Sequence, residues 1–126
     1  MAHLDDAAQP RTISANQEAR IASRLKAFAG QEVDIKIYAQ EHEARMLGEQ
    51  VSASLLKAGL KPRITQVAGT AGQGFAVALH DTRSAPRLAD AIQRAFRSAG
   101  LKLDFVALPG EVTEGKFFVF IGENSG

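Results

Sequence analysis

Cysteine and tryptophan are both missing from this sequence, and tyrosine occurs only once. Without cysteine the chain has no disulfide, no thiolate metal site and no thiol nucleophile, and its redox compartment stays open. With three histidines and one tyrosine, the side chains that usually serve an active site are scarce. We therefore predict that the protein is not an enzyme, that it has no catalytic residues and no metal site, and that it uses no cofactor.

An excess of charge of one sign is missing as well. The 15 lysine and arginine residues nearly balance the 14 aspartate and glutamate residues, which leaves a net charge of +1. Nucleic-acid-binding domains usually carry a clear basic excess, so no nucleic-acid partner is expected. No apolar run approaches the roughly 20 residues that span a bilayer, and residues 1–10 lack the apolar core of a signal peptide. The chain as supplied is therefore expected to be soluble.

The residues that are present are typical of one globular domain. Apolar residues make up 45% of the 126 positions and charged residues 23%, which suits a folded chain. Residues 1–12 are polar and without periodicity, so we interpret them as a flexible tail, in which His3 has no visible partner. Residues 13–122 are expected to form the single domain, and residues 123–126 a second tail.

An internal repeat organises this domain. The run Ala58–Lys61 matches Ala99–Lys102, and Gly74 matches Gly115, at a separation of 41 residues. Apolar positions of the two preceding amphipathic segments match at the same separation. Each repeat has the pattern of an apolar strand, an amphipathic helix, a strand and a glycine-bounded loop. The repeat units lie near 33–73 and 74–114.

Hydrophobic periodicity and capping residues define the expected elements. Ser14 and Gln17 form a capping box, and Gly30 ends the helix that begins there. Ser84 is expected to be the N-cap of the second repeat helix, with Pro86 in its first turn. Apolar positions at helical spacing predict helices over 14–29, 42–58 and about 84–99. Alternating or continuous apolar runs predict strands over 33–39, 63–68, 75–79, 103–108 and 116–121.

The elements follow one another as αβαββαββ, which predicts an α/β fold. Strands joined through a helix are expected to be parallel. We prefer a Rossmann-like sheet of about five strands with an internal βαβ duplication, and the alternative is a ferredoxin-like α+β arrangement. Residues 117–121 are the most apolar segment and are expected to be a central strand. The loops 69–74 and 110–115 leave open whether the chain reverses into a mixed sheet or moves to a parallel neighbour.

Several helix caps and strand ends of this sequence resemble those of a known kind of domain. The motifs are Arg11–Ser14, Phe28–Gln31, Val33–Ile35, Leu55 to Gly59 and Val119 to Gly122. With them, residues 11–122 resemble the soluble α/β module found after transmembrane helices in many uncharacterised proteobacterial inner-membrane proteins. The sequence departs from that pattern at Ala15–Asn16, where a Pro-Glu pair is frequent, and at Leu60, where tryptophan is frequent. The resemblance implies no activity; it implies a bacterial parent protein held at a membrane, with this module as its soluble part.

The most concentrated chemistry lies between a predicted strand and a predicted helix. In open α/β sheets ligands bind beyond the carboxyl ends of the strands, and a helix N-terminus favours an anion. If the first and third strands are neighbours, a site for a small anionic ligand or nucleotide is formed by His42, His80, Asp81, Arg83 and Ser84. In the alternative interpretation Asp81 and Ser84 cap the helix, while His80 and Arg83 are solvated.

Other charged or glycine-rich stretches are less specific. Glu41–Glu43 does not suit a metal, because ligands on one helix need a spacing of three or four residues. Gly69–Gly74 precedes a strand and not a helix, and it lacks the lysine of a P-loop. The second repeat helix has a basic outer side formed by Arg87, Arg94 and Arg97. This side suits a solvated face or, alternatively, an anionic lipid or nucleic-acid surface.

Two functions are favoured by this sequence; a third, an enzyme, has no motif in its support. The first is a non-catalytic interaction or regulatory module that binds a partner protein or forms a homodimer. It predicts an apolar patch or a free sheet edge used in association. The alternative is a sensor of a small anionic ligand or nucleotide, bound at the carboxyl ends of the strands.

Overall fold

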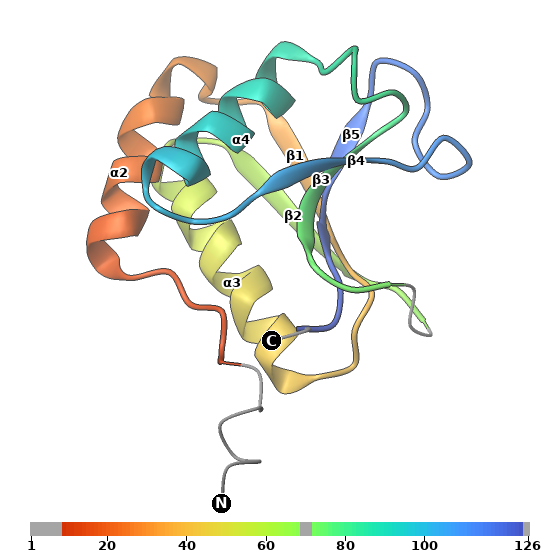
Figure 1. Ribbon diagram of the computed structural model, residues 1–126. Helices are drawn as coiled ribbons and strands as arrows, with labels where there is room; N and C mark the ends of the chain where they lie inside the picture. Colours follow the sequence, from red (N-terminus) through yellow and green to blue (C-terminus); the bar gives the residue numbers. More distant parts are fainter. Residues whose placement is uncertain (1–8, 69–71, 125–126) are drawn as a thin grey trace, which may run out of the picture.

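A computed structural model of the protein describes residues 9–68 and 72–124 (Figure 1). Its helical elements are α2 (Ala15–Leu25), the 3-10 turn η1 (Lys26–Phe28), α3 (His42–Lys57) and α4 (Arg87–Ser98). Its strands are β1 (Glu32–Ile37), β2 (Lys61–Gln66), β3 (Phe75–Leu79), β4 (Asp104–Ala107) and β5 (Phe117–Ile121). The predicted α/β class and the order αβαββαββ are confirmed.

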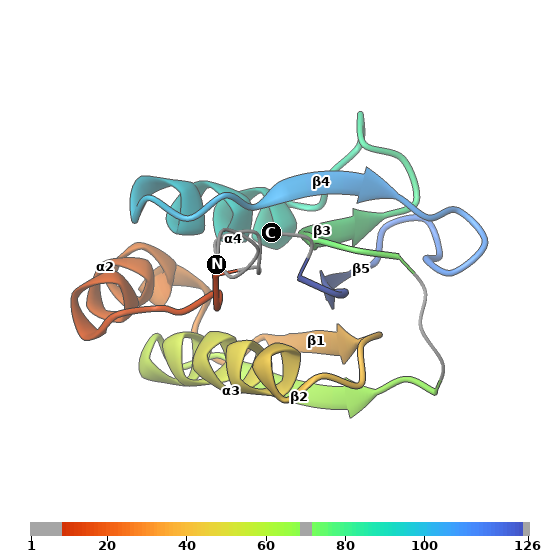
Figure 2. The ribbon, with the colours of Figure 1, turned by 60° about the horizontal axis from the view of Figure 1, so that its bottom comes forward.

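The described strands form one five-stranded sheet in the order β2-β1-β5-β3-β4. β1 is parallel to β2 and to β5, and β3 is parallel to β4, whereas β3 and β5 are antiparallel. All three described α-helices pack on one face of the sheet (Figure 2). The predicted central position of β5 is confirmed. The chain reverses direction after β2 and again after β4, so of the two alternatives at the loops the sheet is the mixed one.

The internal repeat corresponds to two βαβ units, β1-α3-β2 and β3-α4-β4. They lie on the two sides of β5 (Figure 2), and their strands run in opposite directions, because β5 is parallel to β1 and antiparallel to β3. An approximate twofold rotation about an axis through β5 therefore relates them. α2 contacts both α3 and α4 and completes the helix layer. Within the described residues, the two units share a sheet only through β5.

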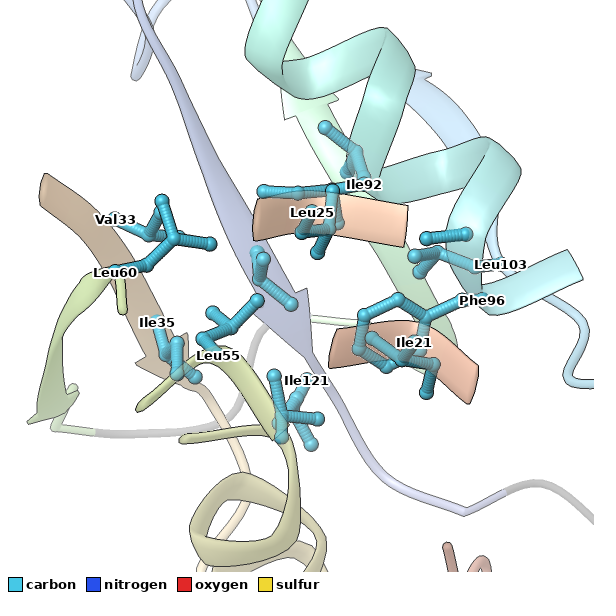
Figure 3. Packing of buried hydrophobic residues seen from close by; sticks show 14 of the residues in the cluster. Ile21, Leu25, Val33, Ile35, Leu55, Leu60, Ile92, Phe96, Leu103 and Ile121 are labelled. Atoms are coloured by element: carbon cyan, nitrogen blue, oxygen red, sulfur yellow. The ribbon is translucent and has the colours of Figure 1, made fainter. Parts of the chain in front are cut away.

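Side chains that alternate along the strands form two apolar clusters. The larger cluster fills the space between the sheet and the helices. Figure 3 shows how residues of separate elements meet there, among them Ile21, Leu25, Ile35, Ile92, Phe96 and Ile121. The smaller cluster lies on the helix-free face and contains Tyr38, Ala76, Ala78, Val112, Phe118 and Phe120. Because Val112 belongs to it, the segment between β4 and β5 covers part of that face.

One predicted helix cap is confirmed and the other is wrong. Ser14 N donates to Gln17 Oε1 at 2.8 Å, and Gln17 N donates to Ser14 Oγ at 3.1 Å, which is the predicted capping box. Pro86, and not Ser84, is the N-cap of α4. Ser84 N donates to the Asp81 carbonyl and closes a turn before the helix. Proline suits this boundary because its fixed φ matches a helix start and its missing N–H removes no intrahelical bond.

The predicted tail boundaries are also wrong. Residues 1–8 and 125–126, with His3, lie outside the described residues. Arg11, which was assigned to the flexible tail, forms an ion pair with Glu43 of α3. At the other end, Asn124 Nδ2 donates to the Gln9 carbonyl at 2.6 Å. The ordered domain therefore extends beyond 13–122 in both directions, because polar contacts of these residues outside the apolar pattern hold them in place.

Candidate functional site

The structure separates the residues of the predicted ligand site. His42 follows the carboxyl end of β1, and His80 follows the carboxyl end of β3. β5 lies between these strands, and β3 runs opposite to β1. The two carboxyl ends therefore lie at opposite ends of the sheet. The prediction that His42 and His80 line one crevice is wrong, because it assumed neighbouring parallel strands.

The remaining residues of that prediction make separate contacts. His80 Nδ1 donates to the Val112 carbonyl at 3.0 Å and so holds the segment that covers the helix-free face. Asp81 Oδ1 accepts from Arg83 N at 2.9 Å and from Arg83 Nε at 3.2 Å. The hydrogen bonds from Arg83 lower the pKa of Asp81. His80 therefore anchors the segment between β4 and β5, whereas Asp81 and Arg83 form the turn before α4.

At the other end of the sheet, Arg11 ties the amino-terminal segment to three elements. Its Nη2 donates to Glu43 Oε1 at 2.7 Å, and its Nε donates to Glu43 Oε2 at 2.9 Å. It also donates to the carbonyls of Gly74 and Gly122, at 3.1 and 2.9 Å. The side-chain hydrogen bond from Arg11 holds the pKa of Glu43 below its ordinary value, against the effect of partial burial. An open groove of about 620 Å³ lies beside Arg11, but this guanidinium is already paired.

A smaller cavity of about 370 Å³ opens on the helix-free face. Tyr38 and Phe120 line it, together with Leu108 and the turn that follows β4. The Tyr38 hydroxyl donates to Glu111 Oε2 at 2.8 Å. Burial, with the hydrogen bond and the negative charge of Glu111, raises the pKa of Tyr38 to about 12. This hydroxyl is satisfied within the fold, so its position indicates a structural role.

Within the part of the chain that the structure describes, no acidic or histidine-rich cluster suggests a metal centre. In residues 9–68 and 72–124, no group of three or more histidine, cysteine, aspartate or glutamate side chains has a geometry that could hold a metal ion. Glu41 and Glu43, on either side of His42, make contacts with other residues. Glu43 pairs with Arg11, and Glu41 Oε1 accepts from Asn124 N at 3.3 Å.

Large apolar side chains that reach solvent lie on one side of the molecule. Among the described residues they are Met46 and Leu56 of α3 and Ile64 of β2, with exposed fractions of 40%, 60% and 40%. α3 and β2 lie side by side at one edge of the molecule, away from α4 and β4 (Figure 2). Scattered exposed apolar residues are ordinary, but exposed apolar residues beside an open sheet edge can mark an interaction surface. We name Leu56 and Ile64, which lie at the β2 edge, the α3–β2 surface.

The second repeat shows the same positions on a charged surface. At the separation of 41 residues, Met46, Ala53 and Leu56 correspond to Arg87, Arg94 and Arg97. All three arginines are exposed. Arg94 pairs with Asp90 at 2.8 Å, and Arg97 pairs with Asp104 at 3.3 Å. Two helices in equivalent places of one fold thus differ at three outer positions, which are uncharged in α3 and cationic in α4.

Leu56 lies on the flank of α3 that faces away from the helix layer. Lys57 pairs with Glu18 of α2 at 3.6 Å, so the flank of α3 that carries Lys57 faces α2. At about 100° per residue, Leu56 is turned by about 100° from Lys57 and lies in line with Arg45 and Ser52, whereas Met46 and Ala53 lie on the same flank as Lys57. β2, the outermost strand, lies on that side. Leu56 is therefore beside the free edge of the sheet.

Backbone groups of β2 point outward at known positions. Lys61 N donates to the Gln31 carbonyl and Val67 N donates to the Ile37 carbonyl, both at 2.8 Å. Because backbone groups alternate in direction along a strand, odd-numbered residues of β2 bond to β1. Pro62, Ile64 and Gln66 therefore direct their backbone groups to the outer edge. Ile64 also lies on the helix side of the sheet, since its register partner Ile35 is in the main core.

The α3–β2 surface was not identified from the sequence. Leu56 lies off the apolar stripe that predicted α3, so a search for periodicity passes over it. The signal that could have found it is the repeat itself, because Leu56 aligns with an arginine. No protein-family model matches the chain, and comparison with curated proteins and with solved structures gives no significant match.

Proposed function

We propose that the protein is a non-catalytic interaction module that binds a protein partner on the α3–β2 surface. The observation that carries this proposal is the difference between the two repeats. The same helix position holds leucine at 56 and arginine at 97, and the leucine is 60% exposed. Burial of apolar surface stabilises a complex by about 25 cal/mol per Å². A bound partner removes this apolar surface from water. The arginines at the equivalent positions of α4 are charged and are stable in contact with water.

The free edge of β2 supports the same surface. Ile64 and Gln66 present backbone groups that can pair with a strand of a partner. Each edge strand carries an exposed ion pair, Arg63–Asp34 at β2 and Arg97–Asp104 at β4. Within β2, Ile64 and Gln66 are the uncharged positions that keep an outward N–H for such pairing.

Membrane tethering through a larger bacterial protein stays part of this proposal. It rests only on the sequence resemblance to modules that follow transmembrane helices. Among the described residues, no helix has the length and apolar character needed to cross a membrane. A tether would therefore have to come from another part of such a parent protein or from a partner.

Site-specific photocrosslinking tests the proposal. A photoreactive phenylalanine analogue is placed at position 56 or, as the matched control, at position 97, and the full chain is irradiated in the cells that express it. We expect a discrete adduct from position 56, whose second component mass spectrometry identifies, and none from position 97. The adduct should disappear when Ile64→Lys places a charge on the same surface.

Two results would contradict the proposal. One is an adduct of equal yield at positions 56 and 97, which would show that crosslinking follows exposure and not a specific surface. The other is no adduct at position 56 in a chain that circular dichroism shows to be folded.

A further inference from the structure

We infer that the partner on the α3–β2 surface is a second copy of this chain. The two copies join by antiparallel pairing of their β2 strands, with Ile64 of each copy on the twofold axis. This inference rests on the proposed docking function and names its partner. Closed twofold dimers are the commonest form of self-association, and each copy then uses the same surface.

The backbone of β2 matches this pairing. Ile64 directs both its N–H and its carbonyl outward, as derived from the bonds of Lys61 and Val67 to the β1 side. In an antiparallel pair, two residues that face each other in this way exchange both hydrogen bonds. Two residues further along, Gln66 N–H of one copy meets the Pro62 carbonyl of the other. Because Pro62 lacks an N–H, it can only accept a hydrogen bond from Gln66 and cannot donate one in return.

The charges of β2 select this register. With Ile64 on the axis, Arg63 lies opposite Thr65 of the second copy, and Lys61 lies opposite Val67 of the second copy. The cationic half of each strand therefore faces an uncharged half. A shift that places Arg63 on the axis would set two guanidinium groups directly opposite each other, although each is paired with Asp34 of its own copy at 3.0 Å, and like charges in that position are unfavourable. The register centred on Ile64 also brings the exposed Ile64 side chains of the two copies together.

The helix layer fits the same arrangement. α3 packs across β1 and β2, so it lies roughly one strand spacing, about 4.8 Å, from the proposed axis. The two α3 helices then lie about 10 Å apart and antiparallel, which is the distance at which helices pack. Leu56 lies on the flank that enters this contact.

The mass of the chain in solution gives the first test. Light scattering coupled to size exclusion should find twice the chain mass of 13.5 kDa for the wild-type protein at micromolar concentration. Leu56→Arg, which copies Arg97, should weaken the dimer roughly tenfold or more, because it places a charge in an apolar contact. Arg94→Ala, which copies Ala53 onto α4, is the matched control and should leave the dimer unchanged. A wild-type chain that stays monomeric at all concentrations overturns the inference.

Single cysteines test the register, because the chain has none of its own. In the proposed dimer the Cα atoms at position 64 lie about 5.5 Å apart, within reach of a disulfide. Those at position 65 lie about 8 Å apart, beyond that reach. Under mild oxidation, Ile64→Cys should therefore give a covalent dimer and Thr65→Cys should not. Covalent dimer from Thr65→Cys in preference would overturn the register.

The outcome separates this inference from the proposed function. A monomeric chain that still crosslinks from position 56 to one identified, different protein keeps the docking surface and removes the second copy as its occupant. A chain that is monomeric and gives no adduct removes both. The inference is supported in full only if two results are obtained. The wild-type dimer must dissociate in Leu56→Arg, and Ile64→Cys, but not Thr65→Cys, must give a covalent dimer.

Discussion

Tyr38 reports on the helix-free face of the sheet without interference, because it is the only tyrosine and tryptophan is absent. Its hydroxyl is bound to Glu111 in the segment between β4 and β5. The pKa of about 12 lies above the ordinary 10.0 because of burial first, and then because of the bond to Glu111 and its charge. The stabilising effect of the neutral phenol is therefore complete below pH 10.0 and is lost as the pH rises through about 12.

The first prediction concerns this titration. We expect the tyrosinate absorbance of the folded wild-type protein to appear near pH 12, and Glu111→Gln to move the midpoint downward. Because burial remains in that variant, the midpoint should stay above the ordinary value. Near-ultraviolet absorbance measures it, and circular dichroism at each pH shows that the chain is still folded. A wild-type midpoint at the ordinary value would mean that Glu111 and its segment do not cover Tyr38.

Glu43 gives a second prediction, in the acid range. Its carboxylate accepts from Arg11, and this lowers its folded-state pKa below the ordinary 4.5. The carboxylate therefore stabilises the fold above that ordinary value, and the contribution is lost as the pH falls through the lowered value. Glu43→Gln should reduce the free energy of unfolding by about 1–3 kcal/mol at neutral pH. Urea unfolding should show this difference shrinking in acid, whereas a difference independent of pH would contradict the role of the ion pair.

At the scale of the element, α2 holds the helix layer together through its first turn. Gln17 Oε1 accepts from Ser14 N in the capping box, and Gln17 Nε2 donates to the Ala99 carbonyl at the end of α4. One side chain thus caps one helix and binds the end of another. The exposed carbonyl at a helix end needs such a donor or water.

The third prediction separates these two contacts. Ser14→Ala should reduce the free energy of unfolding by about 1 kcal/mol, the usual effect of losing an N-cap. Gln17→Ala should reduce it by about 1–2 kcal/mol, since it loses both of its hydrogen bonds. Gln17→Glu keeps the bond to Ser14 N but cannot donate to Ala99, so it should fall between the wild type and Gln17→Ala. Thermal unfolding measures the order, and a Gln17→Glu variant no more stable than Gln17→Ala would argue against the cap.

The elements themselves were largely predictable from the sequence, and their ends less so. The apolar stripe of α3 and the continuous apolar run of β5 are local patterns, and local patterns suffice to define a helix or a strand. The start of α4 was misplaced because Ser84 has the chemistry of a cap, while the turn closed by its N–H to Asp81 moves the helix start to Pro86. A competing hydrogen bond decided the boundary, and such competition is not visible in periodicity.

At the scale of the whole molecule, strand order was beyond the sequence. The repeat predicted two βαβ units, but it carried no information on how they lie relative to each other. Their opposite directions follow from the pairing of β5 with β1 on one side and β3 on the other. These contacts join residues far apart in the chain, such as Ile35 and Val119, and no local pattern encodes them. The predicted ligand crevice failed for this reason, although its residue types were suitable.

The interaction surface depends on a different kind of information. Leu56 and Ile64 look like minor exceptions to a pattern when each element is considered alone. They acquire meaning only when one repeat is compared with the other, because Leu56 aligns with Arg97 and Ile64 with the less exposed Phe105. A duplicated chain thus supplies its own reference for what a solvated face requires.

The position of β5 has a consequence for biosynthesis. β5 is the last described strand in the chain and the middle strand of the sheet. By the time β5 leaves the ribosome, the β1-α3-β2 and β3-α4-β4 units have already emerged, each with an inner edge that lacks its neighbour. The sheet closes in a single late event, when β5 enters between them. Before that event the nascent chain exposes two unfinished sheet edges, and protection by a chaperone matters most then.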